Sequence, residues 1–505
     1  MKLLIIGLDG ASWSFIDPLI AAGKLPALKA LRDRGVRAVL RSTIPPASCP
    51  AWDSFITGKN PGKLGVYDVF MRRPGTYETM RPDASDRRGT SFWNLLPGKS
   101  VIMNLPMTFP PEPVNGILIA GRGATEDAAF TFPPDIKDEI NTVAGGYIIT
   151  PEHHLTIRNL YETLDKQAAV VRHLMEKPWD LFVVNFLATD VVCHGYWGSG
   201  EVEKAYEAVD RLVGEMVAKA GSDCTVIVMS DHGIGPPTSV FWPNAWLQQE
   251  GFLTPRADRK VPGAGSRIKA AVENVGLGPL AHRLTPGRVR RRFVEPPALE
   301  AIDWEKTVAY SIYGNMPRIF LNLQGREPQG TVAPADYEAV REKIAARLRG
   351  LQHPDLKDVT VYKREEIYQG PHLEHAPDLL VQFDGFASAY MQPGLDHAPA
   401  SPMKANFGWH RPEGIFLLAG PGVRTGTVPE LSIVDIAPLA LYLFSAAIPR
   451  DLDGKVRKDL FEPRSPQARR PIILRDPVEK QQERQALTAE QEEKLLRQLK
   501  SMGYS

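Results

Sequence analysis

The chain has 505 residues, of which 43% are hydrophobic, and a formal net charge of +1. This length and apolar content are enough for one large α/β domain carrying an insertion, or for two to four ordinary domains. The balanced charge excludes binding to nucleic acid or an acidic surface through overall charge, so an anionic partner must meet a local patch.

The cysteines and the apolar runs bear on the compartment of the protein. Cys49, Cys193 and Cys224 are too few for a disulfide framework and match no zinc-ribbon spacing, which favours a reducing compartment. The opening run "MKLLIIGLDG" is too short for a secretory signal or a membrane span, and no later segment is long enough to cross a bilayer. We therefore expect a cytoplasmic protein without a transmembrane segment.

Short apolar runs bounded by Gly, Asp or Asn recur along the chain. They are "LLIIGLDG", "SVIMNLP", "GILIAG", "LFVVNFLATD", "VIVMSDHG", "LLVQF" and "GIFLLAGPG". Helical patterns lie between several of them, and residues 202–220 carry apolar side chains at helical spacing. This alternation predicts an α/β fold with a mostly parallel central sheet and helices on both faces.

Composition also suggests how the chain is divided. Residues 240–330 are rich in Arg, Lys, Gly and Pro, and we expect a basic cap inserted between two parts of an α/β core at 1–239 and 331–462. Its cluster of Arg288, Arg290, Arg291 and Arg292 could receive an anionic substrate or a lipid headgroup, although a solvated basic face is the simpler interpretation. Residues 463–505 form a polar tail, in which "TAEQ" at 488–491 predicts a terminal helix that could join two copies of the chain.

The stretch "SCPAWDSFITG" at residues 48–58 follows a double proline. Pro50 is favoured at the first helical position, which places Ser48 and Cys49 at the entrance of a helix. A helix entrance has free N–H groups and a partial positive charge, so Ser48 is well placed to meet an anion. The simpler alternative is a serine that only caps the helix.

Carboxylates and imidazoles follow several of the apolar runs. Asp9 ends the first run, Asp190 and His194 follow "LFVVNFLAT", Asp231 and His232 follow "VIVMS", and His410 precedes "GIFLLAG". Each residue alone is better explained as a turn, an ion pair or a core histidine. Together they predict a metal site, because the loops at the carboxyl edge of a parallel sheet converge.

The ligand types point to the chemistry of that site. Three carboxylates and three imidazoles suit Zn²⁺, with Mn²⁺ as a substitute, and six ligands are enough for two ions. Two ions can hold the entering and leaving oxygens of a displacement at phosphorus. A serine hydroxyl needs such activation, and Ser48 has no G-x-S-x-G motif around it.

These motifs resemble the alkaline phosphatase superfamily, and most closely its type I phosphodiesterase and nucleotide pyrophosphatase branch. The matching pieces are "GLDG", "SCPAWDSFITGKNPGKLGVYD", "TDVVCHGYW", "MSDHGIG" and "GWHRPEGIFLLAGPG". The resemblance implies one ion on Asp190, His194 and His410, and a second on Asp9, Asp231, His232 and the oxygen of Ser48. It also implies a phosphoseryl intermediate on Ser48 that water later releases.

We therefore expect a metal-dependent hydrolase of small phosphate esters, either phosphodiesters or nucleotide-type pyrophosphates. No arginine can be assigned beside Ser48 to hold the extra charge of a terminal phosphate, which favours a diester. Trp52 could stack on the substrate or serve as a core residue. Asn104 follows a predicted strand and could donate a hydrogen bond to a phosphoryl oxygen.

The sequence leaves three alternative functions open. A phosphomutase or phosphotransferase of the same superfamily would use the same centre with a different acceptor. A sulfatase would need an arginine where this chain has Trp52, because the sulfatase motif is C/S-x-P-x-R. A protein without catalysis could keep the metal site to bind a phosphorylated ligand, although binding alone needs no positioned nucleophile.

Overall fold

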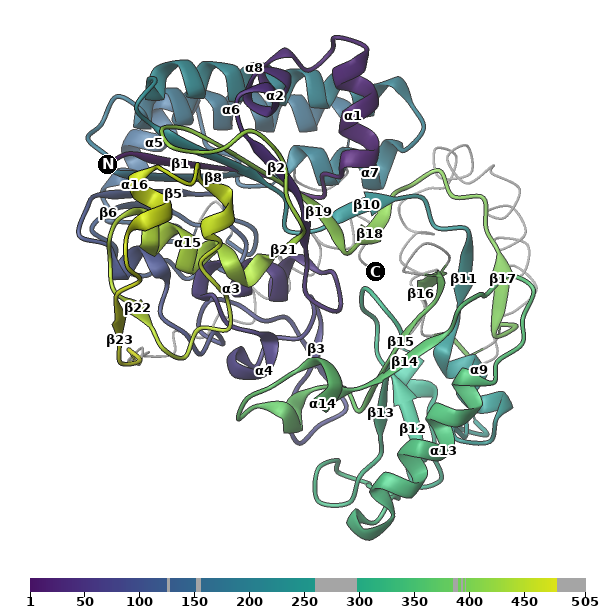
Figure 1. Cartoon of the computed structure of the whole chain (residues 1–505). Coiled ribbons are helices and arrows are strands. Elements are labelled where there is room, and N and C mark those ends of the chain that lie inside the picture. Colours follow the sequence, from purple (N-terminus) through teal and green to yellow (C-terminus); the bar gives the residue numbers. More distant parts are fainter. Residues whose placement is uncertain are drawn as a thin grey trace.

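The computed structural model describes residues 1–124, 128–150, 156–258, 298–384, 389–391, 394–395 and 397–478. These residues form a main α/β unit and a second, smaller unit beside it (Figure 1). Each unit has an apolar core of its own. The arginine cluster at 288–292 and the expected terminal helix lie outside the described residues.

A large sheet forms the centre of the main unit. Its strands run in the order β20 (Gly426–Thr427), β2 (Val36–Arg41), β19 (Glu413–Ala419), β9 (Thr225–Met229), β1 (Leu3–Leu8), β8 (Leu181–Phe186), β5 (Ser100–Met103), β6 (Gly116–Ile119) and β7 (Thr131–Phe132), and β21 (Leu431–Ser432) also pairs with β2. The five strands β9, β1, β8, β5 and β6 are parallel to one another, whereas β19 and β7 are antiparallel to their neighbours. Central strands β1, β8 and β9 are buried along their whole length, as the unbroken apolar runs predict.

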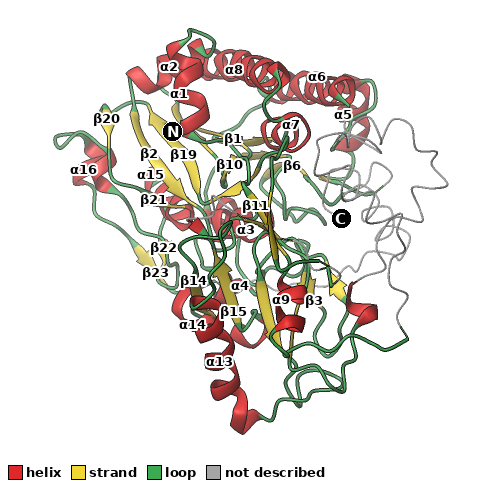
Figure 2. Cartoon of the chain, turned by 90° about the vertical axis from the view of Figure 1, so that its right-hand side faces the viewer, coloured by secondary structure: helices red, strands yellow, loops and turns green. Residues whose placement is uncertain are grey.

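Helices cover both faces of this sheet (Figure 2). One layer contains α1 (Trp13–Ala21), α2 (Pro26–Asp33), α5 (Ile136–Ala144), α6 (Ile157–Leu174), α7 (Ala188–Tyr196) and α8 (Gly200–Ala220). The other face carries α3 (Ser48–Thr57) and α15 (Ile436–Leu443), with α4 (Pro61–Leu64) and α16 (Pro466–Arg469) nearby. The predicted α/β class is confirmed, and α8 begins two residues before the predicted helix at 202–220.

The second unit is built on an antiparallel sheet. Its strands run in the order β12 (Ala309–Ser311), β13 (Arg318–Leu321), β15 (Leu379–Gln382) and β14 (Thr360–Lys363), and α13 (Tyr337–Arg349), α14 (Arg364–Ile367) and α9 (Pro243–Gln249) lie beside it (Figure 1). A further small sheet contains β16 (Ala389–Met391), β11 (Ser239–Phe241) and β17 (Ala400–Pro402). The apolar core of this unit runs from Phe241 to Ala400, past the expected end of the insertion at residue 330. The division of the chain stays a prediction, and the packing favours an insertion that ends near residue 400.

A buried ion pair joins the two units. Asp68, in the loop after α4, accepts hydrogen bonds from the backbone and side-chain nitrogens of Asn315 at 3.0 and 2.9 Å. The Nε of Arg318, at the start of β13, lies 3.3 Å from Asp68, and both charged side chains are buried. A single carboxylate of the main unit therefore holds two residues of the second unit.

The Asp68→Ala variant is expected to lower the free energy of unfolding by about 3 kcal/mol, because it leaves the buried charge of the Arg318 guanidinium without a carboxylate partner. Asp17→Ala serves as the matched control, since Asp17 is 40% exposed where it pairs with Arg37. Loss of that surface pair should cost less than about 1 kcal/mol. Denaturant unfolding measures both values, and equal small losses would show that Asp68 does not hold the two units together.

Candidate active site

The carboxyl ends of neighbouring parallel strands gather the expected site residues at one edge of the large sheet. Asp9 follows β1, Asp231 and His232 follow β9, and Asp190 lies at the start of α7 directly after β8. His410 comes from β18 (Trp409–Arg411), which pairs with β10 (Gly233–Gly235) so that His410 lies opposite Ile234. Strands far apart in the sequence therefore bring one set of side chains together.

Ser48 is the first residue of α3, and the preceding Ala47 is the N-cap. The helix begins two residues earlier than expected, because Pro50 fits anywhere in a first turn whose N–H groups lack intrahelical partners. Ser48 therefore lies one residue after the capping position, and its Oγ lies 3.3 Å from the Nε2 of His232. The capping interpretation is thus wrong, and Ser48 faces the cluster of carboxylates and histidines.

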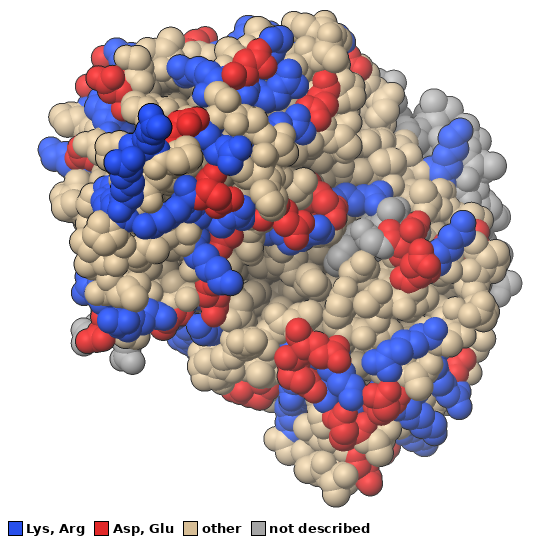
Figure 3. Space-filling view, in the orientation of Figure 1, with Lys and Arg blue, Asp and Glu red and all other residues tan. Residues whose placement is uncertain are grey.

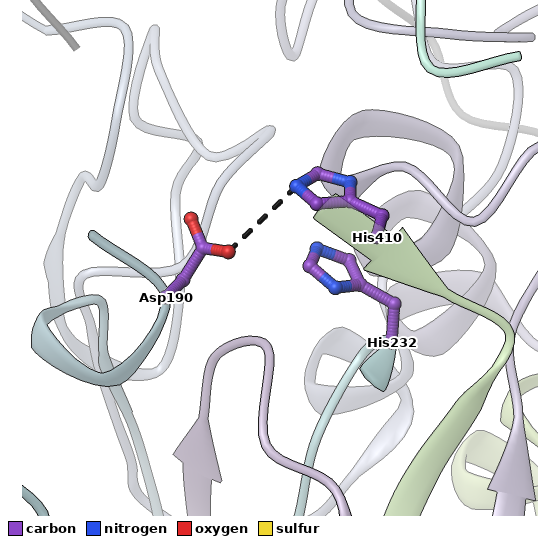
Figure 4. Close-up of side chains that lie close together, drawn as sticks. All are labelled: Asp190, His232 and His410. Atoms are coloured by element: carbon purple, nitrogen blue, oxygen red, sulfur yellow. Dashed lines mark ion pairs between the residues drawn. The ribbon is translucent and has the colours of Figure 1, made fainter. Parts of the chain in front are cut away.

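Two histidines present unprotonated nitrogens to this cluster. Nδ1 of His232 lies 3.0 Å from the carbonyl oxygen of Gly233, and Nδ1 of His410 lies 2.9 Å from that of Pro46. A nitrogen beside a carbonyl must donate, so each neutral ring carries its proton on Nδ1 and offers a lone pair at Nε2. The two rings are stacked, with their centroids 3.8 Å apart, and both face Asp190 (Figure 4).

The expected first metal group lies close together. Nε2 of His194 is 3.2 Å from Oδ1 of Asp190 and 3.0 Å from Nε2 of His410, and His410 Nε2 is 3.7 Å from the same Asp190 oxygen. His232 also forms a group with Asp190 and His410, so it belongs to both candidate metal groups.

The second expected group contains Asp9, Asp231 and His232. His232 Nε2 lies 3.3 Å from Oδ2 of Asp231 and 3.8 Å from Oδ1 of Asp9. Neither of these buried oxygens accepts a hydrogen bond from the described residues. Acceptors that face one another without a donor repel, whereas a cation between them would be bound, so the donor set fits a divalent metal ion.

Burial and mutual repulsion shift the pKa values of these groups. Burial and the charge of Asp190 raise the pKa of Asp9 to about 7, and burial with repulsion from Asp9 raises the pKa of Asp231 well above its usual value. Burial lowers the pKa of His232 to about 4 and the pKa of His410 well below its usual value. Both imidazoles are therefore neutral at pH 7, as metal ligands must be.

Metal-free protein is expected to lose stability as the pH rises from about 6.5 to 7.5, through the folded-state pKa of Asp9 at about 7. In the unfolded chain Asp9 and Asp231 are ionised over this window, whereas their raised pKa values keep protons bound in the folded state, so folding becomes less favourable with rising pH. The depressed pKa values of His232 and His410 act in the opposite direction, but that effect is complete above the unfolded pKa of histidine, about 6.5.

The measurement is thermal unfolding of chelator-treated protein across this window, with and without Zn²⁺. Bound cations should remove the pH dependence by replacing the protons between the carboxylates. A metal-free protein whose melting temperature rises or stays constant would contradict the shared burial of Asp9 and Asp231.

Two further side chains orient Asp9. Nδ2 of Asn185 donates to Oδ2 of Asp9 at 2.8 Å, and Nε1 of Trp52 donates to the same oxygen at 3.2 Å. Sequence reasoning missed Asn185, although a single polar residue inside the apolar strand "LFVVNF" was a usable signal. Trp52 is 1% exposed, and its position favours this orienting role over stacking on a substrate.

Asn104 lies at the carboxyl end of β5, the strand next to β8. Its backbone is left-handed, with φ of 63°, and its side-chain oxygen accepts a hydrogen bond from the hydroxyl of Tyr147. Its Nδ2 is buried and donates to no described residue. The expected role as a donor to a phosphoryl oxygen stays a prediction that this spare N–H group supports.

Two arginines near Ser48 correct the expectation that none can be assigned there. Arg81 and Arg122 line a cleft together with Cys49, the residue after Ser48. Burial raises the pKa of the Cys49 thiol to about 11, and the charges of both arginines oppose that rise. Arg122 follows β6 at the same edge of the sheet, which was a signal, whereas nothing in the local sequence marked Arg81.

Comparison with known proteins identifies the family. The family model of type I phosphodiesterase / nucleotide pyrophosphatase matches residues 3–410, a span that includes all seven expected metal-site residues from Asp9 to His410. The chain belongs to this family. It is therefore a phosphoester hydrolase of the nucleotide pyrophosphatase/phosphodiesterase type, from a metal-dependent family. No relative was found among curated proteins.

Solved structures share the fold at low identity. Human ectonucleotide pyrophosphatase / phosphodiesterase 5 is 13% identical, with a TM-score of 0.53 over 92% of this chain and 100% of that chain. Phosphonoacetate hydrolase from Sinorhizobium meliloti 1021, in complex with phosphonoformate, is 16% identical, with a TM-score of 0.56 over 88% of this chain and 95% of that chain. An inactive murine ectonucleotide pyrophosphatase / phosphodiesterase 5 in complex with AMP is 14% identical, with a TM-score of 0.50 over 92% and 100%.

The surface shows no single charged patch on the face in Figure 3, where acidic and basic side chains are interspersed. This agrees with the near-zero net charge. Within the part of the chain that the structure describes, no helix is both long enough and apolar enough to span a bilayer.

Proposed function

We propose that this protein is a two-metal phosphoester hydrolase in which Ser48 attacks phosphorus and forms a phosphoserine intermediate. The observation that carries the proposal is the position of the Ser48 Oγ, 3.3 Å from His232 Nε2 within a group of buried carboxylates and neutral histidines. Asp190, His194 and His410 would hold one ion, and Asp9, Asp231, His232 and Ser48 would hold the other. The donor set suits Zn²⁺, with Mn²⁺ as the alternative.

When bound, the divalent ions supply charge that lowers the pKa of the serine hydroxyl and stabilises the charge developing on the phosphoryl and leaving oxygens. Ser48 Oγ gives up its proton to solvent and forms the new bond to phosphorus as the bond to the leaving oxygen breaks. Water then attacks phosphorus, the bond to Ser48 Oγ breaks, and the serine takes up a proton again. The first N–H groups of α3 and the unpartnered Nδ2 of Asn104 would donate to phosphoryl oxygens. Asn185 and Trp52 fix Asp9, which keeps the position of that carboxylate constant through the reaction.

The expected substrates are small phosphodiesters or nucleotide-type pyrophosphates. The AMP complex of the murine structure and the phosphonoformate complex of the bacterial hydrolase support a small anionic ligand at such a site. The three cysteines are unpaired and buried, which supports the expected reducing, cytoplasmic compartment. Pairing of two copies through the C-terminal residues 463–505 stays a prediction.

Nitrophenol release from bis(p-nitrophenyl) phosphate, compared between wild-type and Ser48→Ala protein, tests this function. Transfer of the phosphoryl group to an added acceptor, without free phosphate, would instead show a phosphotransferase. A mass change at Ser48 to formylglycine would show a sulfatase. The buried Trp52 occupies the position of the sulfatase arginine, which argues against a sulfatase. A metal-loaded protein that binds phosphate esters and turns none over would show a binding protein.

A further inference from the structure

The loop that carries Asp9 lies between two other loops of the site. Its strand β1 pairs with β9 on one side and with β8 on the other. The loop after β9 carries Asp231, which belongs with Asp9 to the second group of expected metal ligands, whereas β8 leads to Asp190 of the first group. The contacts between the Asp9 loop and α7 therefore determine how the two groups lie relative to one another.

A buried hydroxyl joins these two elements. Thr189, directly before Asp190 in α7, donates from its Oγ1 to the carbonyl oxygen of Asp9 at 2.6 Å, and both residues are 0% exposed. The backbone N–H of Asp9 donates to the carbonyl oxygen of Phe186, the last residue of β8, at 3.3 Å. The peptide groups on both sides of Asp9 are thus held by the segment that leads to Asp190.

A threonine hydroxyl can also bond to a carbonyl of its own segment. Oγ1 of Thr189 lies 3.1 Å from the carbonyl oxygen of Phe186, which is a longer contact than the one to Asp9. A hydroxyl carries one hydrogen, so the shorter contact takes it. The carbonyl of Phe186 already accepts the N–H of Asp9, whereas the buried carbonyl of Asp9 needs the hydroxyl of Thr189. The hydroxyl therefore connects two loops of the site.

The turn after Asp9 also packs directly on Asp190. Gly10 has a φ of 68°, and a Cβ atom at this position would lie 2.9 Å from Oδ1 and 3.2 Å from Cα of Asp190. No side chain fits between them, so a shift of the Asp9 loop would reach Asp190. Ser230 accepts a hydrogen bond from the N–H of Ala11 at 2.8 Å, which ties the same loop to β9 on its other side.

We propose that Thr189 is a positioning residue, whose hydroxyl sets the spacing between the two groups of metal ligands. The inference rests on the proposed function, because it needs both groups to bind ions. Thr189 acts through Asp9 and Asp190 and is itself not a ligand. Hydrogen bonds that orient metal ligands typically contribute about tenfold to a hundredfold to metal affinity.

The test measures Zn²⁺ binding to chelator-treated protein by competition with a coloured chelator, which gives affinity and stoichiometry without turnover. Thr189→Val removes the hydroxyl and keeps the shape of the side chain, and it should bind at least one of the two ions about tenfold more weakly than wild type. Thr189→Ser keeps the hydroxyl and should stay within about threefold of wild type. Thr189→Ala also lacks the hydroxyl and should behave like Thr189→Val, even where the valine variant melts early.

Co²⁺ in place of Zn²⁺ reports the spacing itself, because the magnetic interaction between two paramagnetic ions depends on their separation. The EPR spectrum of Thr189→Val protein loaded with two Co²⁺ ions should therefore differ from the spectrum of wild-type protein. The spectrum of Thr189→Ser protein should match that of wild type.

Thr307→Val is the matched control. Thr307 is also 0% exposed, and its hydroxyl donates to the carbonyl oxygen of Thr254 at 3.3 Å, in the second unit. Its loss should leave the Zn²⁺ affinity and the EPR spectrum unchanged. Equal changes in Thr307→Val and Thr189→Val would overturn the proposal, since metal binding would then report a general loosening of the fold. A Thr189→Ser variant that resembles Thr189→Val would overturn it as well.

These outcomes are separable from those for the proposed function. Metal binding is measured without a substrate, so the effect of Thr189 can be determined whether or not Ser48 is the nucleophile. Wild-type protein that binds no Zn²⁺ would refute the two-metal site together with this inference. Wild-type protein that binds two ions, with a Thr189→Val variant that matches it in affinity and spectrum, would refute this inference alone.

Discussion

Ser48→Ala protein is expected to lose phosphoester hydrolysis by at least about a thousandfold in kcat while it keeps nearly all of its metal. The variant removes the oxygen that forms the bond to phosphorus, but it leaves the six carboxylate and imidazole ligands in place. Nitrophenol release measures the rate, and metal analysis of the same samples measures the ion content. A phosphoryl group isolated on wild-type protein during turnover should map to Ser48 and be missing from the variant.

Ser54→Ala is the control for this substitution. Ser54 lies on the same helix and is fully buried, and its hydroxyl has no hydrogen-bond partner among the described residues. Its loss should leave both the rate and the metal content unchanged. Turnover retained in Ser48→Ala would remove this serine from the mechanism. Loss of metal together with turnover would show that Ser48 acts as a metal ligand and not as the nucleophile.

Replacing Asp231 by Asn or His232 by Ala should lower the metal content by about one ion per chain and reduce turnover to near background. The Asp231→Asn variant loses a negative charge that would bind a cation. The His232→Ala variant loses a ring nitrogen that belongs to both candidate metal groups. The larger loss is therefore expected for His232→Ala. Metal analysis after dialysis against a weak chelator measures the occupancy of each variant.

Asp210→Asn separates metal loss from general instability. Asp210 is also a buried carboxylate, but it accepts hydrogen bonds from the backbone of Ala27 and Leu28, away from the site. This variant should melt earlier and still bind its full complement of metal. Full occupancy in both Asp231→Asn and His232→Ala would refute their assignment as ligands.

Much of the main unit could be predicted from the sequence, because its signals are local. Apolar runs such as "LLIIGLDG" give β1, and helical spacing after residue 202 gives α8. The start of α3 was misplaced, since Pro50 fits at more than one position of a first turn. The division of the chain at residue 330 stays a prediction, because composition does not show that short strands pair across long stretches of chain, as the strands of the second unit do.

The site residues also differ in whether a local sequence signal marks them. Residues at strand ends, such as Asp9 and Asp231, could be found because parallel strands share one carboxyl edge. The structure brings the seven expected side chains together, and their binding of metal stays a prediction. Arg81 could not be found, because only the tertiary fold carries its loop to the cleft beside Cys49.

The pairing of β18 with β10 has a consequence for biosynthesis. His410 joins the cluster through that pairing, yet the whole second unit lies between the two strands in the chain. A ribosome therefore releases Asp9, Ser48, Asp190 and His232 long before it makes the last histidine. Domains commonly begin to fold during synthesis. The growing chain can bring Asp9, Ser48 and His232 together early, but the cluster is complete only after the second unit and His410 have left the ribosome.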